Sequence, residues 1–209
     1  MIYTIGDSHS KETFGIQKKG PNLIPSIKSC YLGPVTMERI GNPNDNSIPE
    51  IASKLYDHVV YVFGEIDVRM HVKNRSSALK ISAEKFIDER LVEKYLTKIS
   101  KKRETSFCVH HVMSTVPPIQ KDIYNSMISD EKWRITSSDE ERAYYTKYMN
   151  SSLQRMCKEF KLEYFDVYSL YKGNDGMATA DLQDKSGHIS NIALVKKLLE
   201  SKGMISGTT

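Results

Sequence analysis

The chemistry that this sequence could carry begins at Ser8, which follows a short apolar, β-branched run and a glycine. A continuous hydrophobic run is typical of a buried strand in a parallel sheet, and ligands bind at the carboxyl ends of such strands. Gly6 favours a tight turn there, which would lift the Ser8 side chain into the crevice. A serine in this position becomes a nucleophile only when a base lies within hydrogen-bond distance and hydrogen-bond donors surround the position of the oxyanion.

An imidazole and two carboxylates stand close together far downstream, ahead of the last predicted helix. His188 could take the Ser8 proton, and Asp184 or Asp181 could fix the tautomer of His188 and stabilise its imidazolium. Simpler interpretations stay open for each residue. Ser8 could be a turn or cap residue, His188 a surface residue before a helix, and the acidic loop only a solvated one.

A charged turn follows the clearest buried strand, residues 58–63, and runs from Gly64 through Glu65 and Asp67 to Arg69. Glu65 could bind a sugar hydroxyl, and the long side chain of Arg69 could carry several donors back over the crevice. We predict that the Arg69 guanidinium faces the Ser8 pocket, held by Glu65 or Asp67. The alternative is a structural ion-pair network. Residues 119–137 lack a strong period and could cover the crevice.

The elements that must position these residues alternate between strands and helices over the whole chain. Helices are expected at about 77–101, 138–160 and 192–201, with a short one possible at 48–56; Ser138 and Glu141 form a capping box for the second. Alternation of this kind predicts a single α/β domain over residues 1–209, a three-layer α/β/α sandwich with a parallel sheet of about five strands. The strands should centre near Thr4, Tyr31, Val60, Val109 and Phe165.

The chain resembles the SGNH (GDSL-like) hydrolase superfamily, whose flavodoxin-like fold agrees with this prediction. Gly6-Asp7-Ser8 matches the first block, which carries the nucleophile. The resemblance implies that Gly33 is the second-block glycine, whose N–H serves the oxyanion hole. It also implies that Gly64 to Asp67 is the third block, and that Asp184 with His188 is the fifth.

Two positions depart from the family pattern. The third block of the family is Gly-x-Asn-Asp, and its Asn donates to the oxyanion, but this chain has Ile66 there. The fifth block is Asp-x-x-His, but Lys185 stands three residues before His188 and Asp184 stands four before it. The Gly-Glu-Ile-Asp-x-Arg form looks like a divergent branch that is often found alongside glycan-building enzymes.

Composition excludes several other classes of protein. The net charge is +4, but the basic residues alternate with acidic ones. The basic runs are not interleaved with aromatic residues, so no nucleic-acid partner is expected. The three cysteines form no C-x-x-C pair, and His110 and His111 point to opposite faces of a strand, so no metal is expected. No dinucleotide or Walker fingerprint is present, so no cofactor is expected. No apolar run reaches membrane length, and Met1 leads directly into a strand, so we expect a cytoplasmic protein without a membrane partner.

These patterns predict a serine esterase or O-acyltransferase that acts on acyl groups of a sugar or glycan, with acetyl expected. Ser8, His188 and Asp184 would be catalytic, whereas Gly33, Gly64, Glu65, Asp67 and Arg69 would bind the oxyanion or the substrate. One alternative is a non-catalytic module of this fold that binds glycan or protein. Another is a glycan-modifying transferase without acyl chemistry that uses Asp67 or Glu65 as its base.

Overall fold

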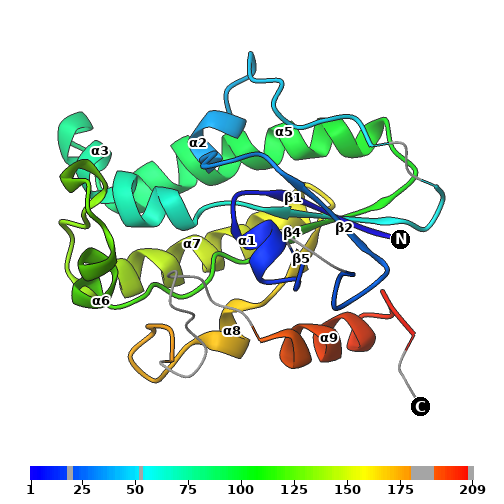
Figure 1. The fold of residues 1–209 in the computed structure, drawn as a ribbon. Helices are drawn as coiled ribbons and strands as arrows, with labels where there is room; N and C mark the ends of the chain where they lie inside the picture. Colours follow the sequence, from blue (N-terminus) through cyan, green and yellow to red (C-terminus); the bar gives the residue numbers. More distant parts are fainter. Residues whose placement is uncertain (18–20, 52–53, 180–190, 207–209) are drawn as a thin grey trace.

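Five parallel strands form the centre of the molecule, in the order β2-β1-β3-β4-β5 (Figure 1). The structure is a computed structural model and describes residues 1–17, 21–51, 54–179 and 191–206. The predicted five-stranded parallel sheet is confirmed, and Val60 lies on its middle strand. The strands are β1 (Ile2–Gly6), β2 (Ile27–Tyr31), β3 (His58–Val62), β4 (Val109–Met113) and β5 (Glu163–Phe165).

Helices cover both faces of the sheet and complete the predicted three layers (Figure 1). Side chains alternate between the faces along each strand, so neighbouring residues enter different halves of the core. Ile5 and Tyr61 pack with α2, η2, α5 and α7, whereas Ile2 and Val60 pack in the half that α8 and α9 complete. The helices are α1 (His9–Glu12), α2 (Met37–Ile40), η1 (Asp67–His71), α3 (Val72–Leu79), α4 (Ala83–Lys85), η2 (Phe86–Val92), α5 (Glu93–Glu104), α6 (Lys121–Met127), η3 (Glu131–Trp133), α7 (Asp139–Glu159), α8 (Tyr168–Tyr171) and α9 (Ile192–Ser201).

The helix predictions hold where a cap or a strong period defines the element. The Ser138–Glu141 capping box is present at the start of α7, and α9 has the predicted bounds. The predicted helix at 77–101 is wrong at its start, because Lys80 adopts a left-handed conformation that ends α3. A new helical stretch begins after Ser82, whose side chain caps it. The described residues of 48–56 form no helix.

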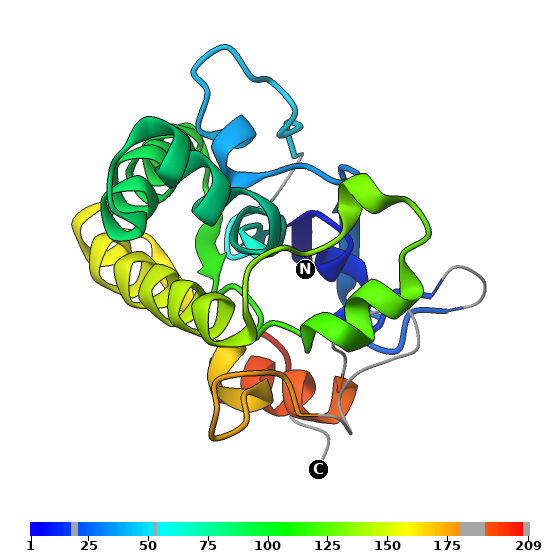
Figure 2. The same cartoon turned by 90° about the vertical axis from the view of Figure 1, so that its left-hand side faces the viewer.

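The topology places β1 at the point where the strand order reverses, because its two neighbours are β2 on one side and β3 on the other. Ligands of open α/β sheets bind at this switch point, outside the carboxyl ends of the strands. Figure 2 looks toward that edge and shows α6 and the segments around it lying across it. No helix among the described residues is long and apolar enough to cross a membrane.

Candidate active site

The strand register brings three predicted site residues to one edge of the sheet. Gly6 pairs with Tyr31 on one side and with Val62 on the other. Ser8, Gly33 and Gly64 each stand two residues beyond this row of paired residues. Because parallel strands end in the same direction, the three residues occupy equivalent positions at the carboxyl edge, around the switch point.

Two glycines are required here because the backbone and side chains approach closely. A Cβ on Gly6 would lie 1.9 Å from the carbonyl oxygen of Val62 on the neighbouring strand. Gly64 has φ of +109°, and a Cβ on it would lie 2.5 Å from Oγ1 of Thr115, at the exit of β4. Gly33 differs, because its φ of +82° needs glycine while the space around it is open. Gly64 therefore serves close packing, and Gly33 shapes an exposed turn.

Ser8 occupies the N-cap position of α1, but its side chain does not cap the helix. Its side-chain hydroxyl makes no capping hydrogen bond, although its carbonyl accepts from Lys11 and Glu12. The backbone N–H groups of Ser8 and Gly33 donate to no acceptor among the described residues. The Ser8 side chain is half-buried. A nucleophile requires an available hydroxyl, and an oxyanion hole requires N–H groups without acceptors.

An aspartate–histidine pair flanks Ser8. Asp7 Oδ1 accepts from the backbone N–H of His9 at 2.9 Å and lies 3.3 Å from Nδ1 of the His9 ring. Burial by itself lowers the pKa of His9, but the Asp7 hydrogen bond and the charges of Asp7 and Glu65 outweigh it, so the pKa is raised. The sequence analysis did not indicate this pair.

Asp67 is fully buried and is already engaged with the backbone of another segment. One carboxylate oxygen accepts from the N–H of Met37 at 2.6 Å, and the other accepts from Glu38 at 3.3 Å. These N–H groups start α2, which follows the turn at Gly33. Asp67, at the start of η1, therefore holds the beginning of α2 and the Gly33 turn before it in place.

Arg69 and Glu65 form an ion pair, with 3.0 Å between Nε and Oε1. The guanidinium also donates to the hydroxyl of Tyr124 on α6 and lies over its ring, 4.6 Å from the centroid. The partner of Arg69 is thus Glu65 and not Asp67. Tyr124 was absent from the sequence reasoning, because nothing in residues 119–137 marks which side chain turns inward.

Two small cavities, each of about 10 Å³, lie next to Glu65. His9 and Glu65 line both, and one of the two is also lined by Arg69, Tyr124 and Arg142. Arg142 was missed as well, although the sequence holds a signal. It lies seven residues before Met149, on the apolar stripe of α7, where a charged residue is unusual.

A much larger cavity lies elsewhere. It measures about 1040 Å³ between α2, α3, η2 and α5, and its described lining contains none of the predicted site residues. His188, Asp184 and Asp181 fall outside the described residues, so their roles remain predictions.

Three side chains could together hold a metal ion. Glu38, Asp67 and His71 place ligand-type atoms within 4.8 Å of one another. However, Asp67 already binds two backbone N–H groups, and Glu38 is paired with Arg75 at 2.7 Å. We therefore assign this group to holding α2 and α3 together.

Comparison with known proteins identifies the fold. No protein-family model matches this chain, and no curated protein matches its sequence. A structure from Streptococcus pneumonia, provisionally described as a platelet activating factor, matches with a TM-score of 0.55 and 14% identity, over 97% of this chain and 82% of its own. A provisionally described acylhydrolase from Bacteroides fragilis matches with a TM-score of 0.54 and 14% identity, over 96% and 85%. Phospholipase A1 from Streptomyces albidoflavus matches with a TM-score of 0.55 and 14% identity, over 96% and 98%.

Proposed function

We propose that this protein is a serine esterase or O-acyltransferase that acts on acyl groups, with acetyl on a sugar or glycan as the expected substrate. The observation that carries the proposal is Ser8 itself. Ser8 lies beyond the carboxyl end of β1, at the switch point of the sheet, and its hydroxyl makes no capping hydrogen bond. Solved structures with this fold include phospholipase A1 and a provisionally described acylhydrolase, which supports acyl chemistry.

In the proposed reaction, Ser8 Oγ attacks the acyl carbonyl while His188 takes the hydroxyl proton. Asp184 orients His188 and stabilises the imidazolium. The N–H groups of Ser8 and Gly33 receive the developing oxyanion. His188 then gives the proton to the departing alcohol, and a water or a sugar hydroxyl attacks the acyl-enzyme and restores Ser8.

Ile66 is the main difficulty, because the family has an oxyanion donor at that position. Removing one such donor typically costs about 10²–10³ in rate. The Ile66 side chain is buried and carries no hydrogen-bond donor. Arg69 supplies a guanidinium on the same turn, and we propose that it compensates.

The Ile66 substitution favours a second candidate function, a non-catalytic module that binds glycan or protein. A third, a glycan-modifying transferase without acyl chemistry, would use Asp67 or Glu65 as its base. One experiment separates all three. The wild type, Ser8→Ala and Ser126→Ala are treated with a fluorophosphonate probe and assayed with p-nitrophenyl acetate; Ser126 is an exposed serine on α6 and serves as the control.

We expect labelling and turnover in the wild type and in Ser126→Ala, and neither in Ser8→Ala. Absence of both in all three proteins would favour the binding module. Turnover of a sugar substrate that survives in Ser8→Ala would favour the transferase without acyl chemistry.

A further inference from the structure

Arg142 is a deeply buried cation beside the candidate site. Its side chain is 1% exposed, and its one ion-pair partner is Asp139, whose own side chain is 36% exposed. The Nε–H of Arg142 is buried and finds no acceptor among the described residues. A guanidinium carries five donors in a fixed fork, so this one is left with unused capacity.

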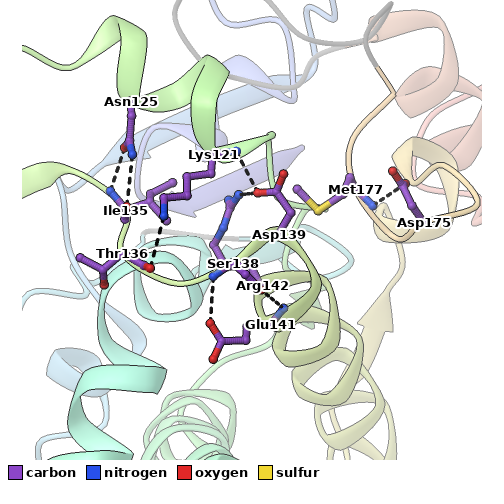
Figure 3. Close-up of polar contacts among 10 residues, drawn as sticks. All are labelled: Lys121, Asn125, Ile135, Thr136, Ser138, Asp139, Glu141, Arg142, Asp175 and Met177. Carbon is purple, nitrogen blue, oxygen red and sulfur yellow. Dashed lines mark hydrogen bonds and ion pairs between the residues drawn. The ribbon is translucent and has the colours of Figure 1, made fainter.

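Arg142 contributes to fixing the segment that covers the crevice, as Figure 3 shows. Asp139 accepts from the guanidinium of Arg142 and, at 2.9 Å, from the backbone N–H of Lys121 at the start of α6. This role uses only one end of the fork. It explains neither why the guanidinium lines a cavity nor why its Nε–H lacks an acceptor.

Cationic side chains outnumber carboxylates among the described lining residues of that cavity, although Asp139 also pairs with Arg142. Arg69 and Arg142 both line it, whereas Glu65 is the one carboxylate among its described lining residues. Glu65 lies at ion-pair distance from Nε of Arg69 but outside hydrogen-bond geometry, so that Nε–H is also without an acceptor. His9, the residue after Ser8, completes the polar wall, and its pKa is raised by Asp7.

We propose that Arg142 and Arg69 form a subsite for an acidic group, a carboxylate or a phosphate, on the molecule whose ester Ser8 attacks. This inference rests on the proposed function and adds a substrate class to it. One oxygen of the group takes the position between the two guanidinium groups. Planar forks of this kind match the geometry of carboxylate and phosphate oxygens.

The cavity of about 10 Å³ holds one oxygen atom but not a whole acidic group. Tyr124 closes it from α6, stacked on Arg69 and hydrogen-bonded to it. Binding of the substrate therefore exchanges the Tyr124 hydroxyl for an anionic oxygen and moves the ring outward. An anion is the stronger partner for arginine, so the exchange is favourable.

The test measures binding without turnover, in the full-length Ser8→Ala protein. The two ligands are 4-acetoxybenzoate and its methyl ester, which is neutral and larger by one methyl group. We expect Ser8→Ala to bind the acid roughly tenfold to hundredfold more tightly by calorimetry, the effect of hydrogen bonds to a charged group. Adding Arg142→Gln should abolish the preference, whereas adding Arg155→Gln, an exposed arginine on the same helix, should not.

A second variant keeps the proposal testable if Arg142→Gln does not fold. Glu65→Gln removes the carboxylate from the cavity wall and should tighten binding of the acid, a direction that a purely structural role does not produce. Displacement of the acid by acetate identifies a carboxylate site, and displacement by inorganic phosphate at lower concentration identifies a phosphate site. Equal affinity for acid and ester, or a preference that survives Arg142→Gln, would overturn the subsite. Because Ser8 is absent from these proteins, a failure of the esterase proposal would appear separately, in the wild-type turnover assay.

Discussion

Replacing Asp67 with alanine should disturb stability and turnover together, because this carboxylate ties the end of β3 to the Gly33 turn. The substitution leaves the N–H groups of Met37 and Glu38 without their acceptor. Asp67 is fully buried, so water cannot simply replace it. We therefore expect α2 and the Gly33 turn before it to lose their fixed position.

The magnitude follows from the two bonds. A hydrogen bond to a charged group contributes about 1.5–3 kcal/mol, and the bond from Glu38, at 3.3 Å, is long and counts for less than the bond from Met37 at 2.6 Å. The free energy of unfolding should fall by about 2–4 kcal/mol. For a chain of 209 residues, this corresponds to a loss of about 5–15 °C in Tm. A displaced oxyanion donor should lower kcat at least about tenfold.

Thermal unfolding followed by circular dichroism and turnover of p-nitrophenyl acetate measure both effects. Asp166→Ala is the matched control, since Asp166 accepts from the backbone N–H of Ser169 at an exposed helix start far along the sheet. It should cost about 1 kcal/mol and leave kcat unchanged. An Asp67→Ala protein with unchanged Tm would refute the anchoring role. Lowered stability with full turnover would show that the Gly33 turn need not be held for the reaction.

Three further substitutions or conditions test other parts of the structure. Gly64→Ala, with φ of +109° and a Cβ 2.5 Å from Thr115 Oγ1, should cost about 3 kcal/mol in urea unfolding; a cost below about 0.5 kcal/mol would contradict this packing. Arg69→Ala should lower kcat for p-nitrophenyl acetate at least about tenfold. Its free energy of unfolding should fall by only about 1–2 kcal/mol, because the variant loses the ion pair with Glu65. Equal kcat in wild type and variant would show that Arg69 serves only in that ion pair. Burial lowers the pKa of His111 to about 3 from 6.5, so the unfolded chain binds a proton that the folded chain does not, and stability should fall as pH drops from about 6.5 toward 3. His111→Gln should flatten that fall in urea titrations at several pH values, and an unchanged slope would contradict the buried neutral form.

The fold was predictable because its determinants are local and periodic. Apolar β-branched runs mark the strands, and the Ser138 capping box and the amphipathic stretch of α9 mark helices that the structure confirms. Local patterns failed at Lys80, where a left-handed residue ends α3 inside an otherwise helical stretch. Lysine carries no signal for that conformation. The N–H groups of Lys80 and Ile81 donate to the carbonyls of Ser77 and Ser76, so hydrogen bonds at the helix end stabilise it.

The sequence by itself determined which residues follow the carboxyl end of each strand. It therefore also determined that Ser8, Gly33 and Gly64 would lie at one edge of the sheet. Only the tertiary structure decided what the charged side chains there do. It turned Asp67 toward the backbone of α2, paired Arg69 with Glu65 under Tyr124, and buried Arg142 beside them. The reason is physical: strand register follows from the period of the hydrophobic pattern, whereas a charged side chain takes whichever partner long-range packing brings within hydrogen-bond distance.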